Sequence, residues 1–220
     1  MTSEGIVMDW AVLADFGTAI GTLVLAIATF SATRSANRSA RFAERTLIEG
    51  LRPLLLPSNF SDEAQKVRFR DGRWLVVPGG RATMEIDETA VALAISVRNV
   101  GSGIAVLHGW RIVDSPEDPP SLPAEFRRLT RDIYVSTNYV GFVQVAIRDT
   151  QSEAYRLVSE RARTGGIIFV DVLYGDAEGA QRVISRFAVG GGPAENDASE
   201  EEYFVTVSRH WNIDQPAPRA

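Results

Sequence analysis

The chain has 220 residues, of which 45% are hydrophobic and 23% are charged, and its formal net charge is -5. It contains no cysteine, which excludes disulfide-built scaffolds, thiolate zinc sites, iron–sulfur proteins and cysteine nucleophiles. The apolar content, with only 18 glycines and 10 prolines, also excludes collagen and low-complexity disorder.

The first strong pattern is an uncharged apolar segment over residues 16–33. As a helix it would measure about 27 Å, close to the roughly 30 Å hydrocarbon core of a bilayer. Asp15 lies at its end, within reach of the headgroups, and Trp10 lies further out, where an amphipathic ring is favoured. The acidic N-terminus lacks the basic region of a signal peptide, and a soluble helix would need a polar face. We expect a short tail over 1–9 and a transmembrane helix over 10–33.

A group of arginines follows this segment, and no basic residue precedes it. By the positive-inside rule, the N-terminus lies outside and residues 34–220 lie in the cytoplasm. The arginines recur on one helical face, so a juxtamembrane helix is expected over 34–50, either contacting anionic lipid or forming a solvated stalk. The predicted membrane-interface residues are Trp10, Arg34, Arg38, Arg41 and Arg45.

Gly17 and Gly21 form a GxxxG pattern inside the apolar segment. Small residues at this spacing let two helix backbones approach closely. The pattern predicts a helix-packing face and a homodimer through the membrane helix; chance in an Ala- and Gly-rich segment is the alternative.

After Gly50 the periodicity becomes that of strands. Residues 91–98 alternate large apolar with small or polar side chains, which predicts a strand with one buried face and a hairpin with residues 104–112. A second hairpin is expected between 167–174 and 182–189. One helix is expected from a capping box at 150–153 to Gly165 and Gly166, and a short one through Phe126 and Leu129. Further strands are predicted over 51–57, 73–77, 81–86, 133–136, 140–147 and 203–208.

These elements predict a mainly β fold: an antiparallel β-sandwich over residues 51–212 with one inserted helix, followed by a flexible tail over 213–220. Three motifs carry a resemblance: RPLLLP at 52–57, RNVGSGIA at 98–105 and VLYGDAEG at 172–179. With the acidic N-terminus and the arginine helix, the chain resembles small bacterial single-span membrane proteins. The resemblance implies an immunoglobulin-like sandwich and brings no catalytic or cofactor residues with it.

Motifs for chemistry are scarce. His108 and His210 have no ligand or carboxylate at motif spacing, and the carboxylate clusters do not match a calcium loop. Asp171 lies among apolar residues and needs a partner such as Arg182 or Arg186 across the hairpin. We therefore predict no catalytic residue, cofactor or metal ligand. The basic cluster of Arg127, Arg128 and Arg131 predicts a solvated or lipid-proximal patch and no nucleic-acid binding, because the chain is acidic and lacks an aromatic platform.

The pattern as a whole favours a non-enzymatic protein-interaction module, held at the cytoplasmic membrane surface, whose partners are the bilayer and an unidentified protein. One alternative is a membrane-tethered hydrolase with a carboxylate site at Asp171 or Asp176. The other is an envelope sensor whose residues 1–9 face outward.

Overall fold

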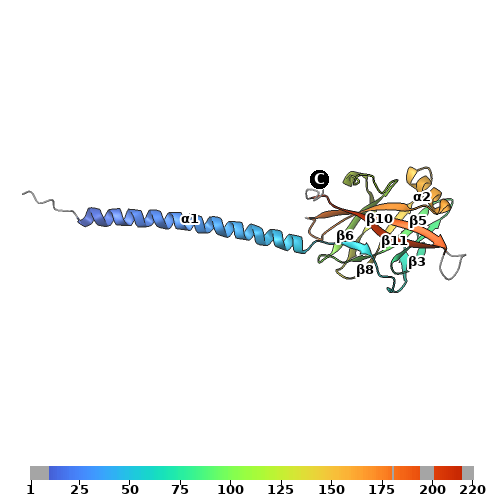
Figure 1. The fold of residues 1–220 in the computed structure, drawn as a ribbon, viewed down its shortest axis with the longest axis horizontal. Helices are drawn as coiled ribbons and strands as arrows, with labels where there is room; N and C mark the ends of the chain where they lie inside the picture. The colour runs from blue at the N-terminus through green and yellow to red at the C-terminus, as the bar shows by residue number, and fades with distance from the viewer. Residues whose placement is uncertain (1–9, 180, 194–200, 215–220) are drawn as a thin grey trace, which may run out of the picture. The chain divides into compact units, whose positions relative to one another are not determined.

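The computed structural model describes residues 10–179, 181–193 and 201–214 and divides the chain into two compact units, Met1–Glu49 and Gly50–Ala220 (Figure 1). Helix α1 (Trp10–Gly50) is continuous over 41 residues. Among the described residues it is the one helix long and apolar enough to cross a membrane. The predicted long N-terminal helix is therefore confirmed, whereas the tail over 1–9 lies outside the described residues.

Three threonine side chains in the apolar part of α1, those of Thr18, Thr22 and Thr33, bond to the helix itself. The hydroxyl of Thr18 donates to the carbonyl of Ala14 at 2.9 Å, and that of Thr22 donates to the carbonyl of Thr18 at 2.8 Å. These bonds matter because a hydroxyl in hydrocarbon has no water to bond. Helix α1 thus needs no partner to satisfy these threonines.

Strands make up 42% of the structure and are antiparallel, so the predicted mainly β class is confirmed. The helices after α1 are a single 3-10 turn, η1 (Pro123–Glu125), and α2 (Glu153–Thr164). The strands are β1 (Leu55–Pro57), β2 (Gln65–Arg68), β3 (Trp74–Val77), β4 (Arg81–Ile86), β5 (Val91–Asn99), β6 (Ala105–Val113), β7 (Arg127–Val135), β8 (Val140–Ile147), β9 (Ile168–Gly175), β10 (Arg182–Pro193) and β11 (Glu201–Asn212).

Nine of these strands form one hydrogen-bonded sheet in the order β1-β5-β4-β11-β10-β9-β6-β7, with β8 paired to β5. Strands β1 and β4 pair with successive parts of β5, so β8 must occupy its other edge. Strand β11 joins β4 to β10 and thereby links the two halves of the sheet. Strands β7 and β8 are therefore the two edge strands of the sheet, and among the described strands β7 pairs only with β6 and β8 only with β5.

The main core lies between the two halves of the sheet, since inward side chains of β5 and β8 pack with those of β9, β10 and β11. The prediction that β5 buries one face was incomplete. Val91, Leu93 and Ile95 enter the main core, but Ala92 and Ala94 are also buried, under the separate β2–β3 hairpin. Small side chains on that face let the second layer approach closely. Strand β2 was not predicted, because only Val67 in it is buried.

The predicted hairpin of residues 91–98 with 104–112 is wrong. Strand β5 pairs with β1, β4 and β8, whereas β6 pairs with β7 and β9. After β5 the chain crosses from one half of the sheet to the other, and the buried side chain of Asn99 stabilises this segment. Its amide donates to the carbonyls of Gly103 at 2.6 Å and Val135 at 2.9 Å. The turn signals at 99–103 therefore mark a crossover between the two halves of the sheet.

Two smaller expectations also change. Leu129 lies in β7, because residues 127–135 pair with β6, so the expected short helix is reduced to η1. Helix α2 is confirmed, but its N-cap is Ser152, which accepts from the amide of Tyr155. Its end is at Gly165, where the positive φ of 68° favours glycine. The β9–β10 hairpin is confirmed, with Gly175 paired to Arg182.

We predict that Ala94→Leu destabilises the β domain, because its extra atoms have no room between β5 and the β2–β3 hairpin. Overpacking of this kind costs about 1–3 kcal/mol. The loss of stability is measured by urea unfolding of the full-length protein in detergent, monitored by tryptophan fluorescence. The matched control is Ala124→Leu at an exposed position. Equal stability of the two variants would show that the space above β5 is not tightly filled.

Candidate functional site

A buried ion pair lies at the centre of the β domain. Asp171 on β9 and Arg186 on β10 are direct cross-strand partners, and both are fully buried. The Nε of Arg186 donates to Oδ1 of Asp171 at 2.6 Å, and its Nη2 donates to Oδ2 at 2.9 Å. The predicted pairing of Asp171 is therefore found with Arg186, while Arg182 pairs with Asp214.

The same guanidinium organises the proline-rich loop between β6 and η1. Its Nη1 donates to the carbonyls of Ser115, Pro116 and Asp118 at 2.9–3.1 Å. The hydroxyl of Ser121, further along the loop, donates to Oδ2 of Asp171 at 2.7 Å. Prolines give this loop few amide donors for its own carbonyls, and Arg186 supplies donors to several of them.

A groove of about 690 Å³ lies between this loop, β6 and the start of α2. This volume is within the range of ligand sites in proteins. Two ion pairs lie at the groove, because Arg111 contacts Glu125 at 2.7 Å and Arg161 contacts Asp114 at 2.6 Å. The other charged residues that line it, Asp118, Arg127 and Glu153, form no ion pair within the described part of the chain. Its apolar lining residues are Ile112, Val113, Pro119, Pro120, Leu122, Ala154 and Leu157.

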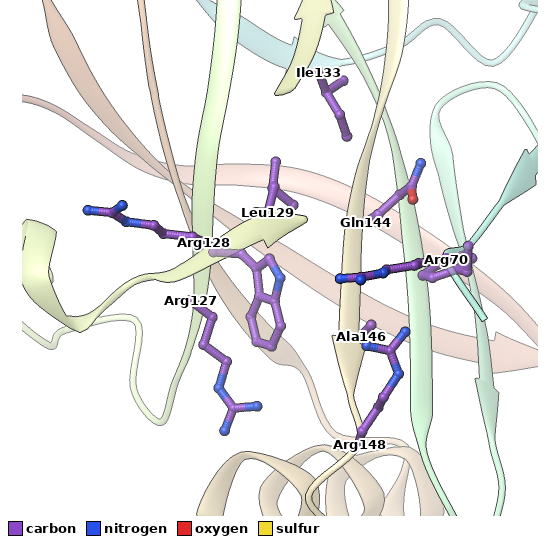
Figure 2. A pocket seen from close by; sticks show the side chains of 10 residues that line it. Arg70, Arg127, Arg128, Leu129, Ile133, Gln144, Ala146 and Arg148 are labelled. Atoms are coloured by element: carbon purple, nitrogen blue, oxygen red, sulfur yellow. The ribbon is translucent and has the colours of Figure 1, made fainter. Parts of the chain in front are cut away.

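A second, smaller cavity of about 160 Å³ lies where β7 begins and β8 ends, and we call it the arginine pocket. Figure 2 shows Arg127 and Arg128 on one side of it, and Arg70 and Arg148 on the other. The guanidinium of Arg127 lies 5.5 Å from the ring centroid of Trp110. These two residues line both cavities, so the groove and the arginine pocket share a wall.

The predicted membrane-interface and helix-packing residues all belong to α1. Arg34, Arg38 and Arg41 are exposed, at helical spacings that place them on one face. The side chains of Trp10 and Arg45 lie outside the described part of the structure. Gly17 and Gly21 have open space around them, so the homodimer stays a prediction.

Sequence reasoning missed the two cavities. It identified Arg127 and Arg128 as a basic cluster, but Arg70 and Arg148 come from distant parts of the chain and join them only in the fold. Arg131, the third member of that predicted cluster, has no described side chain.

His210 and the second carboxylate, Asp176, take part in structural hydrogen bonds. His108 lies at the β-bulge of β6, between Leu107 and Gly109. Nδ1 of His210 is 3.0 Å from the buried hydroxyl of Ser185, which is 3.0 Å from that of Tyr174. Burial raises the pKa of Tyr174 to about 12. The pKa of His210 is lowered, mainly because the ring is desolvated and to a lesser extent because the positive charge of Arg52 is near. Asp176 accepts from the amide of Gln181.

Within the described residues, no group of three or more histidine, aspartate and glutamate side chains is placed to hold a metal ion. The chain matches no protein-family model, and the search of curated proteins finds no significant relative. A functional assignment therefore rests on the geometry of the groove and the arginine pocket.

We predict that Arg186→Gln lowers the free energy of unfolding by about 3–5 kcal/mol, because it leaves Asp171 buried without its counter-charge. Limited proteolysis should also cleave the loop over 114–123 faster than in the parent protein. The matched control is Arg182→Gln, whose partner Asp214 is solvent-accessible and whose loss costs about 1 kcal/mol or less. Equal losses in the two variants would contradict a central role for the buried pair.

Proposed function

We propose that the protein is a membrane-anchored, non-enzymatic interaction module that binds another protein through the groove beside the proline-rich loop. The observation that carries this proposal is that Arg186 builds the groove in advance by binding three carbonyls of the loop. A preformed site lowers the ordering cost of binding. The mixed lining of prolines, aliphatic side chains and charged side chains of both signs suits a peptide segment of a partner.

The proposed location is the cytoplasmic surface of the cell membrane, with α1 crossing the bilayer over 10–33 and continuing as the juxtamembrane helix over 34–50. The length and composition of α1 support the crossing, and the arginines after residue 33 support the orientation. Trp10 and the arginines would lie at the membrane interface. Packing through Gly17 and Gly21 would make a homodimer.

We further propose that residues 51–212 form an immunoglobulin-like sandwich. The supporting observation is that the two halves of the antiparallel sheet enclose one core, as the two sheets of a sandwich do.

The two alternative functions have less support. Both oxygens of Asp171 are engaged by Arg186 and Ser121, and the carboxylate is fully buried, which leaves it no access to a substrate. Asp176 is also buried. The envelope-sensor alternative depends on residues 1–9, which lie outside the described residues.

The orientation predicts the result of a protease experiment on the full-length protein with a C-terminal tag. In intact spheroplasts the tag is expected to be protected, and after lysis it is expected to be cut, while alkaline carbonate leaves the protein in the membrane. Cleavage of the tag in intact spheroplasts would reverse the orientation, and release by carbonate would rule out a spanning helix.

The groove predicts where a partner can be captured. A photo-crosslinking amino acid placed at Leu122, which is 66% exposed, is expected to give one discrete adduct in cells. The matched control is the same amino acid at Tyr139, which is 69% exposed and does not line the groove. The adduct should disappear when Arg186→Gln releases the loop. The same adducts from both positions, or none from Leu122, would contradict the proposal.

A further inference from the structure

The arginine pocket has an unusual charge composition. Four of the ten residues that line it are arginines, and none of the ten is aspartate or glutamate. Many arginines elsewhere in the described β domain form ion pairs instead. These are Arg73, Arg81, Arg98, Arg111, Arg161, Arg182 and Arg186.

Within the described residues, Arg70, Arg127 and Arg128 have no carboxylate within 4.0 Å, and Arg148 has only a 3.7 Å contact with Asp71. The chain as a whole carries a net negative charge. Three arginines without an ion-pair partner, beside a fourth in one long ion-pair contact, create a local positive potential, which a concave surface focuses. An anion in the pocket would offset the repulsion among the guanidinium groups.

The elements around the pocket hold these arginines from different directions. Arg127 begins β7 and lies against Trp110, Arg148 directly follows β8, and Arg70 lies in the turn between β2 and β3. In Figure 2, Arg128 points away from the other three, and Gln144 lies on the same side as Arg70 and Arg148. The pocket is therefore lined by guanidinium groups from two sides, with the ends of Arg70 and Arg148 toward its middle and Arg127 across from them.

We propose that the arginine pocket binds a phosphate group, either free or as part of a lipid headgroup, through Arg70, Arg127 and Arg148. A guanidinium donates paired, parallel hydrogen bonds that match the oxygens of phosphate. Phosphate has enough oxygens to accept from several guanidinium groups at once, whereas a carboxylate has only two. The cavity of about 160 Å³ admits a group of this size and not an extended peptide. This site goes beyond the proposed protein interaction and does not depend on it.

The test uses full-length protein in phosphatidylcholine nanodiscs, titrated with inorganic phosphate by calorimetry at an ionic strength held constant with chloride. Saturable binding to one site is expected. Arg70→Gln and Arg148→Gln should each weaken it about tenfold or more, because each removes charge-assisted hydrogen bonds. The matched control is Arg156→Gln, which makes the same charge change at an exposed position of α2, away from the pocket. It should leave the Kd unchanged.

A second arm identifies the source of the phosphate group. If nanodiscs enriched in phosphatidic acid block binding of inorganic phosphate, and Arg148→Gln removes the block, the lipid headgroup is the occupant. Undiminished binding in the same nanodiscs assigns the pocket to soluble phosphate.

Three outcomes would overturn the site: no saturable binding, equal weakening in Arg156→Gln, or unchanged binding in both pocket variants. Binding of a glutamate-rich peptide without binding of phosphate would do so as well. Thermal unfolding of each variant checks that it is folded. Arg70 and Arg148 are exposed and lie in separate segments. If one of the two variants does not fold, phosphate binding by the other still tests the site.

Discussion

The buried ion pair of Asp171 and Arg186 is the interaction on which the shape of the groove in the β domain depends. The desolvation cost of two charges in a core is offset only when their geometry is good and their remaining donors are bonded. Both conditions are met here, since the carboxylate is held bidentately and Nη1 of Arg186 bonds to carbonyls of the loop. One side chain thus joins the centre of the sheet to the wall of the groove.

Charge in this domain is distributed in two ways. Around the groove residues of both signs are present, and Arg111 with Glu125 and Arg161 with Asp114 form ion pairs there. In the neighbouring arginine pocket all four charged lining residues are arginines, and among the described residues only Arg148 has an ion-pair partner, Asp71 at 3.7 Å. Trp110 and Arg127 line both the groove and the arginine pocket and form the wall between them. A partner in the groove and an anion in the pocket would therefore contact the same wall, and each could affect the other's affinity.

Local signals in the sequence predicted local structure well. The capping and glycine signals located α2, and the paired strand patterns around 175–179 located the β9–β10 hairpin. That hairpin in turn made Arg186 a foreseeable partner for Asp171. The same reasoning failed at 99–103, because turn residues do not distinguish a hairpin from a crossover; the buried bonds of Asn99 decide that. The arginine pocket was not predictable either, since Arg70, Arg127 and Arg148 meet only through pairings between distant strands.

Strand β11 follows all the other described strands in the sequence, although it lies in the middle of the sheet. This order has a consequence for how the sheet forms during synthesis. This strand joins β4 to β10, and Ala82 pairs with Tyr203, more than half the chain away. Until residues 201–212 have left the ribosome, the two halves of the sheet have no connection through the hydrogen bonds of β11, and the edges of β4 and β10 are open to wrong partners. An N-terminal anchor would be inserted well before that moment. The nascent domain would then complete its sheet while tethered, which restricts its encounters with other chains.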